Sequence, residues 1–348
     1  MQAATVSPGF ALRPYQIDLL GRWDRSKSRR ALVVLPTGGG KTNVAVAAIA
    51  KVVTDGGVAI VVAHRRELIH QVRERLKDAG LDMASLGVAD PTSPVQLWGP
   101  VGLRNHLRRE KIKNVRLVVI DEAHRSVAGS YTEIIKAFPR ARIMGLTATP
   151  VRLDNRGLGG VYEEIIEGPD AEELIDQGHM SRARIFVPDV FPDVKNVKRS
   201  GSDFNRESLA KVVSRRTIVG NIVKEWKKHC EGMKTIAFAV NIRHANIIAR
   251  KFRVAGVSTE AVLSETAKEK RDELVDRFKR GDLTVLVNCD LFVEGFAVPE
   301  ARCAILARPT KSLTVHLQQC GRVHRPGPIT PIIQNHSDNK RTLGAPWT

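Results

Sequence analysis

The sequence lacks the features that mark membrane-spanning and disulfide-stabilised secreted proteins. Its apolar runs are short, and one such as Val58 to Ala63 has only the length of a strand, whereas a membrane span needs about 18 consecutive apolar residues. Met1 to Phe10 contain no basic start followed by an apolar stretch, so we expect no secretion signal. The four cysteines are widely spaced and form no C-x-x-C pair, which disfavours a disulfide framework or a zinc site. A reducing cytoplasm is the expected location, with no membrane partner.

Aromatic residues are also scarce, at 5% of the 348 residues. The rest of the composition, with 43% hydrophobic and 26% charged residues, is that of an ordinary globular chain and excludes wholesale disorder. Because domains usually contain about 100 to 200 residues, this length predicts two of them.

Positive charge is in clear excess, with 55 Lys and Arg against 37 Asp and Glu, a balance of +18. Residues 1–165 hold 25 basic and 15 acidic residues, and residues 166–348 hold 30 and 22. Both halves are therefore basic. This pattern is typical of a chain that lays two domains along a polyanion such as nucleic acid, although a solvated basic surface would look the same.

Short β-branched runs alternate with longer amphipathic stretches in both halves. The sequence predicts strands at 31–35, 58–63, 115–120 and 142–146, with helices at 42–53, 66–79 and 131–138 between them. The rhythm returns after residue 234, with strands at 235–240, 283–288 and 303–306. Such alternation predicts parallel sheets covered on both faces. Three proline residues and weak periodicity mark an interdomain connection at 167–205, with a possible strand at 183–187, which leaves domains at 1–166 and 206–348.

A glycine-rich turn lies between the first predicted strand and the first predicted helix. It reads Leu35-Pro-Thr-Gly-Gly-Gly-Lys-Thr42. Gly38, Gly39 and Gly40 would let backbone N–H groups turn around an anion at a helix N-terminus. Lys41 would then contact the β- and γ-phosphates of a nucleotide, and the Thr42 hydroxyl would ligate Mg²⁺. A flexible loop with an incidental lysine is the alternative, but the strand before and the helix after favour a phosphate site.

Two adjacent carboxylates follow another apolar strand, in the segment Ile120-Asp-Glu-Ala-His124. Asp121 is placed to hold Mg²⁺, directly or through water, and Glu122 to polarise an attacking water. His124 would sense the γ-phosphate or couple to a neighbouring element. Two such carboxylates could merely cap a helix, but their occurrence in the same half as the phosphate loop favours the catalytic interpretation.

A further motif, Gly145-Leu-Thr-Ala-Thr-Pro150, makes the pattern specific. In this order the motifs resemble those of superfamily 2 helicases, in the DEAD/DEAH-box group related to type III restriction motors and to phage and repair helicases. The resemblance implies an α/β fold of two tandem RecA-like parallel-sheet domains with an ATP cleft between them. It implies ATP and Mg²⁺ as cofactors, a nucleic-acid partner, and action in a cytoplasm, that of a phage host included.

The resemblance also assigns roles to residues outside the two phosphate-site motifs. Adenine recognition falls to Arg13 and Gln16, the nucleotide-binding loop includes Thr37, and the domain interface includes Glu294 and Gly295. Coupling of nucleotide state to closure falls to Thr147 and Thr149. The segment Gln318-Gln-Cys-Gly-Arg-Val-His-Arg325 matches the motif that supplies Gln318 as a γ-phosphate contact and Arg322 and Arg325 as arginine fingers. Nucleic-acid contacts are implied at five positions: Arg65, Gly102, Arg104, Asn241 and Ser264.

Three functions remain open at this point. The resemblance favours an ATP-dependent DNA helicase or translocase over an RNA helicase of the same architecture. Two departures from the family pattern, Leu35 in place of a glycine and Ala297 in place of a usual aspartate, keep a third possibility open. This is a non-hydrolysing nucleic-acid clamp or a motor subunit that needs a partner.

Overall fold

A computed structural model describes residues 10–345 except 65, 82–83, 89, 91, 127–128, 150–156, 202, 290–300, 338 and 340–342; the side chains of 66 and 67 are not described either. The chain divides into two compact units, Met1–Asp170 and Ala171–Thr348. Each unit contains its own parallel sheet, which confirms the predicted α/β fold of two RecA-like domains.

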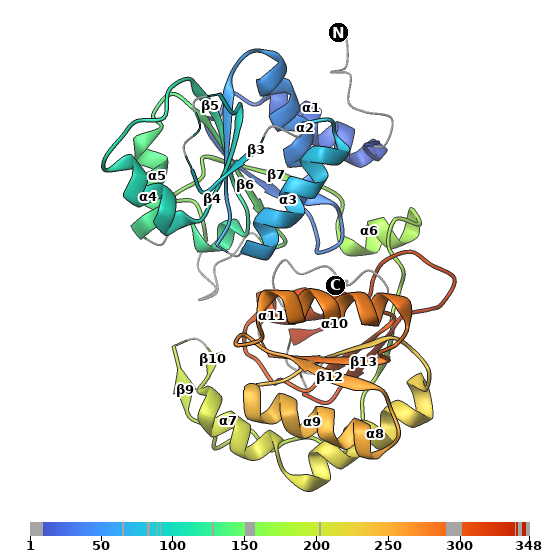
Figure 1. Cartoon of the computed structure of the whole chain (residues 1–348). Coiled ribbons are helices and arrows are strands. Elements are labelled where there is room, and N and C mark those ends of the chain that lie inside the picture. The colour runs from blue at the N-terminus through green and yellow to red at the C-terminus, as the bar shows by residue number, and fades with distance from the viewer. Residues whose placement is uncertain are drawn as a thin grey trace. The chain divides into compact units, whose positions relative to one another are not determined.

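The first unit is a seven-stranded parallel sheet in the order β3-β4-β2-β5-β6-β1-β7. Helices cover both of its faces, with α1, α2 and α3 on one side and α4 and α5 on the other (Figure 1). Its strands are β1 (Arg30–Val34), β2 (Val58–Val62), β3 (Ala84–Leu86), β4 (Val95–Trp98), β5 (Val115–Ile120), β6 (Arg142–Thr147) and β7 (Glu164–Glu167). Its helices are α1 (Pro14–Arg25), α2 (Lys41–Thr54), α3 (Arg66–Asp78), α4 (Pro100–Leu107), the 3₁₀ turn η1 (Ala123–Arg125) and α5 (Gly129–Ala137).

The central strands of this sheet are buried on both faces, which explains their unbroken apolar sequences. β2 reads Val-Ala-Ile-Val-Val and β5 ends in Leu-Val-Val-Ile, and all of these side chains except Val58 are almost fully buried. β-branched residues suit a pleated strand between two helical layers. A core cluster on the α4/α5 side joins Val118 and Ile143 of the sheet to Leu103 and Ile134 of the helices.

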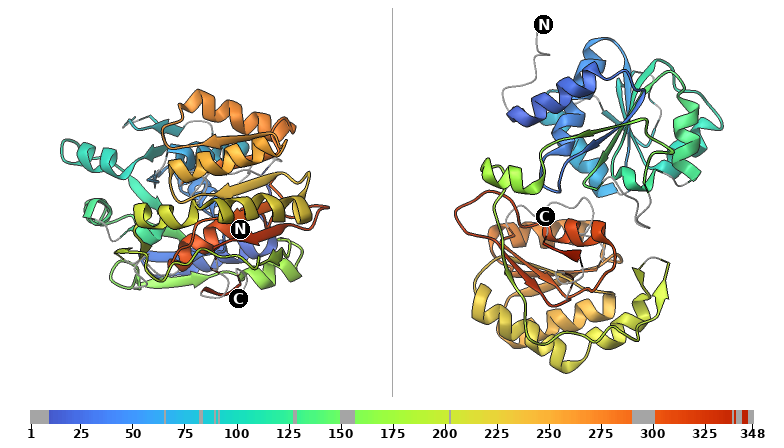
Figure 2. Two further views of the ribbon diagram at one scale, coloured as in Figure 1. Left: turned by 90° about the horizontal axis from the view of Figure 1, so that it is seen from below. Right: turned by 180° about the vertical axis from the view of Figure 1, so that it is seen from behind.

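The second unit contains a six-stranded parallel sheet in the order β12-β13-β11-β14-β15-β8 and a separate hairpin, β9–β10. In Figure 1 its sheet lies between α10 and α11 on one face and α8 and α9 on the other, and Figure 2 shows these layers from two further sides. Its strands are β8 (Arg184–Phe186), β9 (Arg199–Ser200), β10 (Asp203–Phe204), β11 (Thr235–Phe238), β12 (Thr259–Val262), β13 (Val285–Asn288), β14 (Cys303–Leu306) and β15 (Ile332–Asn335). Its helices are α6 (Ala171–Asp176), α7 (Arg206–Val213), α8 (Arg216–Cys230), α9 (Ile242–Val254), α10 (Lys268–Arg280) and α11 (Leu313–Cys320).

Most of the segment predicted as an interdomain connection is grouped with the second unit. The unit boundary falls after Asp170, and the segment beyond it includes α6, β8 and the hairpin. β8 extends the second sheet by pairing in parallel with β15. This pairing ties the segment to the second sheet. The prolines of the segment disfavour a strand in the sequence and so hide the pairing, which explains why the segment was predicted as a connection. Among the described residues, no helix is long and apolar enough to cross a membrane.

Candidate functional site

The glycine-rich turn joins β1 to α2 and faces the N-terminus of that helix. Gly38 and Gly40 have φ values of 94° and 81°, in the left-handed region that only glycine enters at little cost. The Lys41 ammonium donates to the carbonyl oxygens of Leu35 (3.0 Å) and Pro36 (3.4 Å) within the turn. Thr42 lies in the first turn of α2. The backbone and charge required of a phosphate-binding loop are therefore present.

Two residues of α1 pack directly against this turn. The Tyr15 hydroxyl donates to the Gly39 carbonyl (2.8 Å), and Gln16 Nε2 donates to the same oxygen (3.2 Å). Gln16 Oε1 accepts from the Arg13 backbone N–H (2.9 Å), so both ends of this buried amide are engaged. A Cβ on Gly40 would lie 2.2 Å from Gln16 Nε2. Gln16 therefore contacts the phosphate loop, and its adenine contact stays a prediction.

The two predicted carboxylates follow β5 and are both buried. Glu122 adopts φ 51°, an unusual conformation for a non-glycine residue, and its backbone N–H donates to Asp121 Oδ1 (2.9 Å). Burial, together with the Glu122 charge, raises the pKa of Asp121 to about 6, and Lys41 opposes this shift. His124 Nδ1 lies 3.3 Å from Glu122 Oε2 inside the unit. A nearby cation would favour the charged Asp121.

β6 brings the two motifs together. It lies between β5 and β1 in the sheet, and Leu35, at the start of the loop, donates its backbone N–H to the Thr147 carbonyl (3.1 Å). The Thr147 hydroxyl donates to the Thr149 carbonyl (2.7 Å) and accepts from the Thr149 N–H (3.2 Å). Because the strands are parallel, the loop after β1, the acids after β5 and these threonines all lie at the carboxyl edge of one sheet.

In the second unit, the predicted arginines follow α11. The Ser312 side chain caps this helix by accepting from the Val315 N–H (3.4 Å), and Gln318 is buried near its end. Arg322 and Arg325 are half-buried in the turn beyond. Arg302 Nη1 donates to the Arg325 carbonyl (2.6 Å) and Nη2 to that of Pro326 (3.1 Å). Arg302, which immediately precedes β14, thus holds the turn that carries Arg325.

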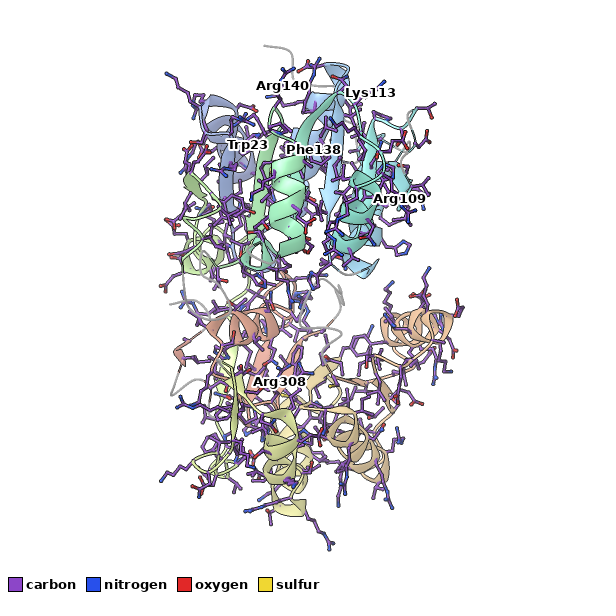
Figure 3. All side chains as sticks on the ribbon, turned by 90° about the vertical axis from the view of Figure 1, so that its left-hand side faces the viewer. Trp23, Arg109, Lys113, Phe138, Arg140 and Arg308 are labelled. Atoms are coloured by element: carbon purple, nitrogen blue, oxygen red, sulfur yellow. The ribbon has the colours of Figure 1, made fainter. Side chains whose placement is uncertain are left out.

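The residues predicted to contact nucleic acid lie in both units, on α4 of the first and in a groove of the second. Gly102 is exposed on α4, and Arg104 on the same helix is half-buried. Further exposed basic residues follow α4, among them Arg109 and Lys113, which are labelled in Figure 3. In the second unit, Asn241 and Ser264 line one groove. Arg65, Glu294 and Gly295 lie outside the described residues, as does Ala297.

Two family models match the chain, one in each half. Residues 9–152 match the model of the type III restriction enzyme res subunit, and residues 216–327 match that of the helicase conserved C-terminal domain. A 51.5 kDa protein of a Lactococcus phage is 32% identical over 323 residues, which cover 91% of this chain and 68% of that protein. The chain belongs to the superfamily 2 helicases. Its place is in their type III restriction-like group, as the motifs predicted.

Other helicases give the same result. IRC3 of Saccharomyces cerevisiae, which is assigned as an ATP-dependent helicase, is 31% identical over 89% of this chain and 49% of its own length. The DNA 3'-5' translocase XPB2 of Sulfurisphaera tokodaii is 26% identical over 90% of this chain and 78% of its own length. A fragment assigned to the HsdR subunit of a Vibrio vulnificus type I restriction enzyme has the same fold, with a TM-score of 0.76 at 21% identity over 96% of this chain and 66% of the fragment. The chain thus spans about half of the yeast helicase.

Sequence reasoning missed several residues that support the helicase motifs. Tyr15 lies between Arg13 and Gln16, the two predicted adenine contacts, but no role was predicted for it. Arg302 had no signal, because the Arg325 and Pro326 carbonyls that it binds lie 23 and 24 residues further along the chain. Asp203 had none either: it accepts from the Thr310 hydroxyl (2.7 Å) and the Lys311 N–H (2.9 Å) just before α11.

Proposed function

We propose that the chain is a DNA-directed ATPase that moves along or unwinds its substrate strand. One observation carries this proposal: Lys41, Asp121 and Thr147 converge at the carboxyl edge of one parallel sheet, within a chain of the helicase family. A half-buried lysine in a glycine loop, whose charge acts on a buried carboxylate nearby, suits a nucleoside triphosphate.

The donor set of the first unit fits Mg²⁺. Asp121 offers carboxylate oxygens and Thr42 a hydroxyl, which are ligands that a hard cation prefers. Burial and the Glu122 charge raise the pKa of Asp121 although Lys41 opposes them, so a cation at this carboxylate would favour its charged form. Among the described residues no cluster of three or more His, Cys, Asp or Glu could hold a metal alone. An ion at this site would be held by one carboxylate and one hydroxyl of the chain together with the phosphates. When bound, Mg²⁺ would neutralise phosphate charge.

The side chains then divide the work of hydrolysis. Lys41 and the N–H groups at the start of α2 bind the phosphates, and Lys41 exchanges its carbonyl partners in the loop for phosphate oxygens. Glu122 orients the attacking water and takes its proton, with His124 placed to hold that carboxylate. Arg322 and Arg325 stabilise the charge that develops on the γ-phosphate, an effect that contributes about 10³–10⁵ in rate in related sites.

DNA is the proposed strand because several of the sequence relatives, such as those named XPB, are named for DNA. XPB2 is named as a DNA 3'-5' translocase. The +18 balance supports a polyanion but does not separate DNA from RNA. Binding through the backbone predicts tolerance of sequence and a strong dependence on salt.

The decisive experiment measures Mg²⁺-dependent ATP hydrolysis with single-stranded DNA, duplex DNA, RNA or no nucleic acid. We expect DNA to stimulate turnover at least about tenfold, because substrate-driven ordering completes such sites. Stimulation by RNA alone would overturn the choice of DNA. ATP binding without turnover under every condition would replace the motor with a nucleic-acid clamp.

A further inference from the structure

The second unit contains a groove of about 800 Å³ between α7 and α9. α7 contributes Arg206 and Glu207 to one wall, and α9 contributes a row of residues to the other. The ends of β12 and β13 close the groove with Ser264 and Cys289. The sequence indicated Asn241 and Ser264 as nucleic-acid contacts, but it gave no indication of α7.

The charge of the groove is positive on both walls. Arg243 and Arg250 lie seven residues apart on the same exposed stripe of α9, and Arg206 is exposed on α7. Within the described part of the chain, Arg243 and Arg250 form no hydrogen bond or ion pair. Among the described residues that line the groove, Glu207 is the acidic one, so three arginines face one carboxylate there. A concave surface with this balance concentrates an anion.

The lining also indicates which part of a nucleic acid would fit. None of the described residues that line the groove is aromatic, and their apolar surface comes from aliphatic residues such as Ile242 and Ile247. Bases that stack need aromatic faces, whereas phosphates need cations and sugars pack on aliphatic surface. Arginines that flank an aliphatic surface therefore suit a sugar–phosphate backbone.

The α7 wall lies between the two matched family regions, which cover residues 9–152 and 216–327. It is nevertheless firmly attached to the second unit. Asp203 binds the Thr310 hydroxyl and the Lys311 N–H, and the Lys311 ammonium lies 5.1 Å from the centre of the Phe204 ring. The Asn205 side chain then caps α7 by accepting from the Ser208 N–H (3.0 Å). Arg206 is thus presented from an anchored helix rather than from a free loop.

We propose that this groove binds the phosphodiester backbone and that Arg206 and Arg250 grip it from the two walls. The inference rests on the proposed function for its ligand class and adds a contact surface that the family motifs do not include. α7 acts as a second wall that keeps the strand on the second unit.

The test measures binding of labelled single-stranded DNA by fluorescence anisotropy, without nucleotide, over a range of salt concentrations. Arg206→Ala and Arg250→Ala should each weaken binding about threefold, as expected for an exposed charge pair. Each should also reduce the slope of log K against log salt by about 0.7, the value for one phosphate contact on a single strand. Arg206→Lys should retain most of that slope because it keeps the charge.

Lys211→Ala is the matched control, since Lys211 is exposed on the same helix but does not line the groove. It should leave affinity and slope unchanged. Equal losses from Lys211→Ala and Arg206→Ala would overturn the proposal in favour of diffuse attraction, and so would an unchanged slope in Arg206→Ala. Duplex DNA and RNA are measured in parallel to identify the backbone preferred. Because binding is read without ATP, an inactive ATPase would refute the proposed function and leave this test intact.

Discussion

The predicted nucleotide-site residues of the two units are held in place by different kinds of contact. In the first unit, Lys41 binds carbonyls five and six residues away, and Glu122 binds its neighbour Asp121. In the second unit, the turn before α11 is fixed by Asp203, 107 residues from Thr310, and the turn after it by Arg302. The contacts of Lys41 and Glu122 are therefore local to their own motifs, whereas the turns around α11 are held by residues far along the chain. Substitutions outside the motifs should impair the second site more than the first.

The largest effect is expected from the self-contained site. Lys41→Ala removes the ammonium that would bind the phosphates, and loss of one preorganised charge in such a site lowers turnover by about 10²–10³ or more. ATP hydrolysis at saturating DNA measures this loss. Lys51→Ala, on the exposed side of the same helix where Lys51 pairs with Asp24, should retain activity. Turnover within a factor of about two of the unsubstituted chain in Lys41→Ala would show that the loop does not bind the triphosphate.

A smaller effect is expected from the hydrogen bond between Thr310 and Asp203, which holds the turn before α11. Thr310→Val removes the hydroxyl that donates to Asp203 and accepts from the Ser312 N–H, with little change of volume. Because α11 leads to Arg322 and Arg325, its displacement should lower kcat about tenfold, since small misplacements near the chemistry are costly. KM for ATP should change little, as the phosphate loop is in the other unit.

Thr310→Ser is the conservative partner, because it keeps the hydroxyl and should restore kcat. Asp203→Asn tests the other end of the same contact and should lower kcat in the same direction. Thermal unfolding of all three variants separates positioning from loss of fold. Equal kcat in Thr310→Val and Thr310→Ser would show that the hydrogen bond to Asp203 does not position the arginines.

The same difference explains what could be predicted from sequence. Lys41, Thr42 and Asp121 could be predicted as site residues because each belongs to a contiguous motif whose backbone and charge are local requirements. The long apolar strands and amphipathic helices followed from periodicity, and the parallel fold followed from their alternation. β8 has only three residues and was barely visible in sequence. Asp203 and Arg206 could not be found, because their roles come from partners far along the chain, and no local pattern encodes such pairs.

The smallest predicted effect is the opposite response of the two units to acid. In the second unit, burial lowers the pKa of His244, His316 and His336 to about 4. The unfolded chain takes up protons near pH 6.5 and the folded unit does not, so stability present above that pH is lost as the pH falls toward 4. Between pH 7.5 and 6 the loss is about 1 kcal/mol for each histidine.

In the first unit, Asp121 has a raised pKa of about 6, so its contribution to stability grows as the pH falls and is lost as the pH rises through that value. Hydrogen exchange of core strand amides reads each unit separately: protection of β11 and β13 should fall between pH 7.5 and 6, while that of β2 and β5 should be retained. His244→Gln should flatten the pH dependence of the second unit, whatever it does to absolute stability. Equal losses of protection in both units as the pH falls, with the same losses in His244→Gln, would show that these buried groups do not set the pH dependence of stability. In that case the buried acid of the first unit and the buried neutral histidines of the second unit would not make the stability of the two units depend differently on pH.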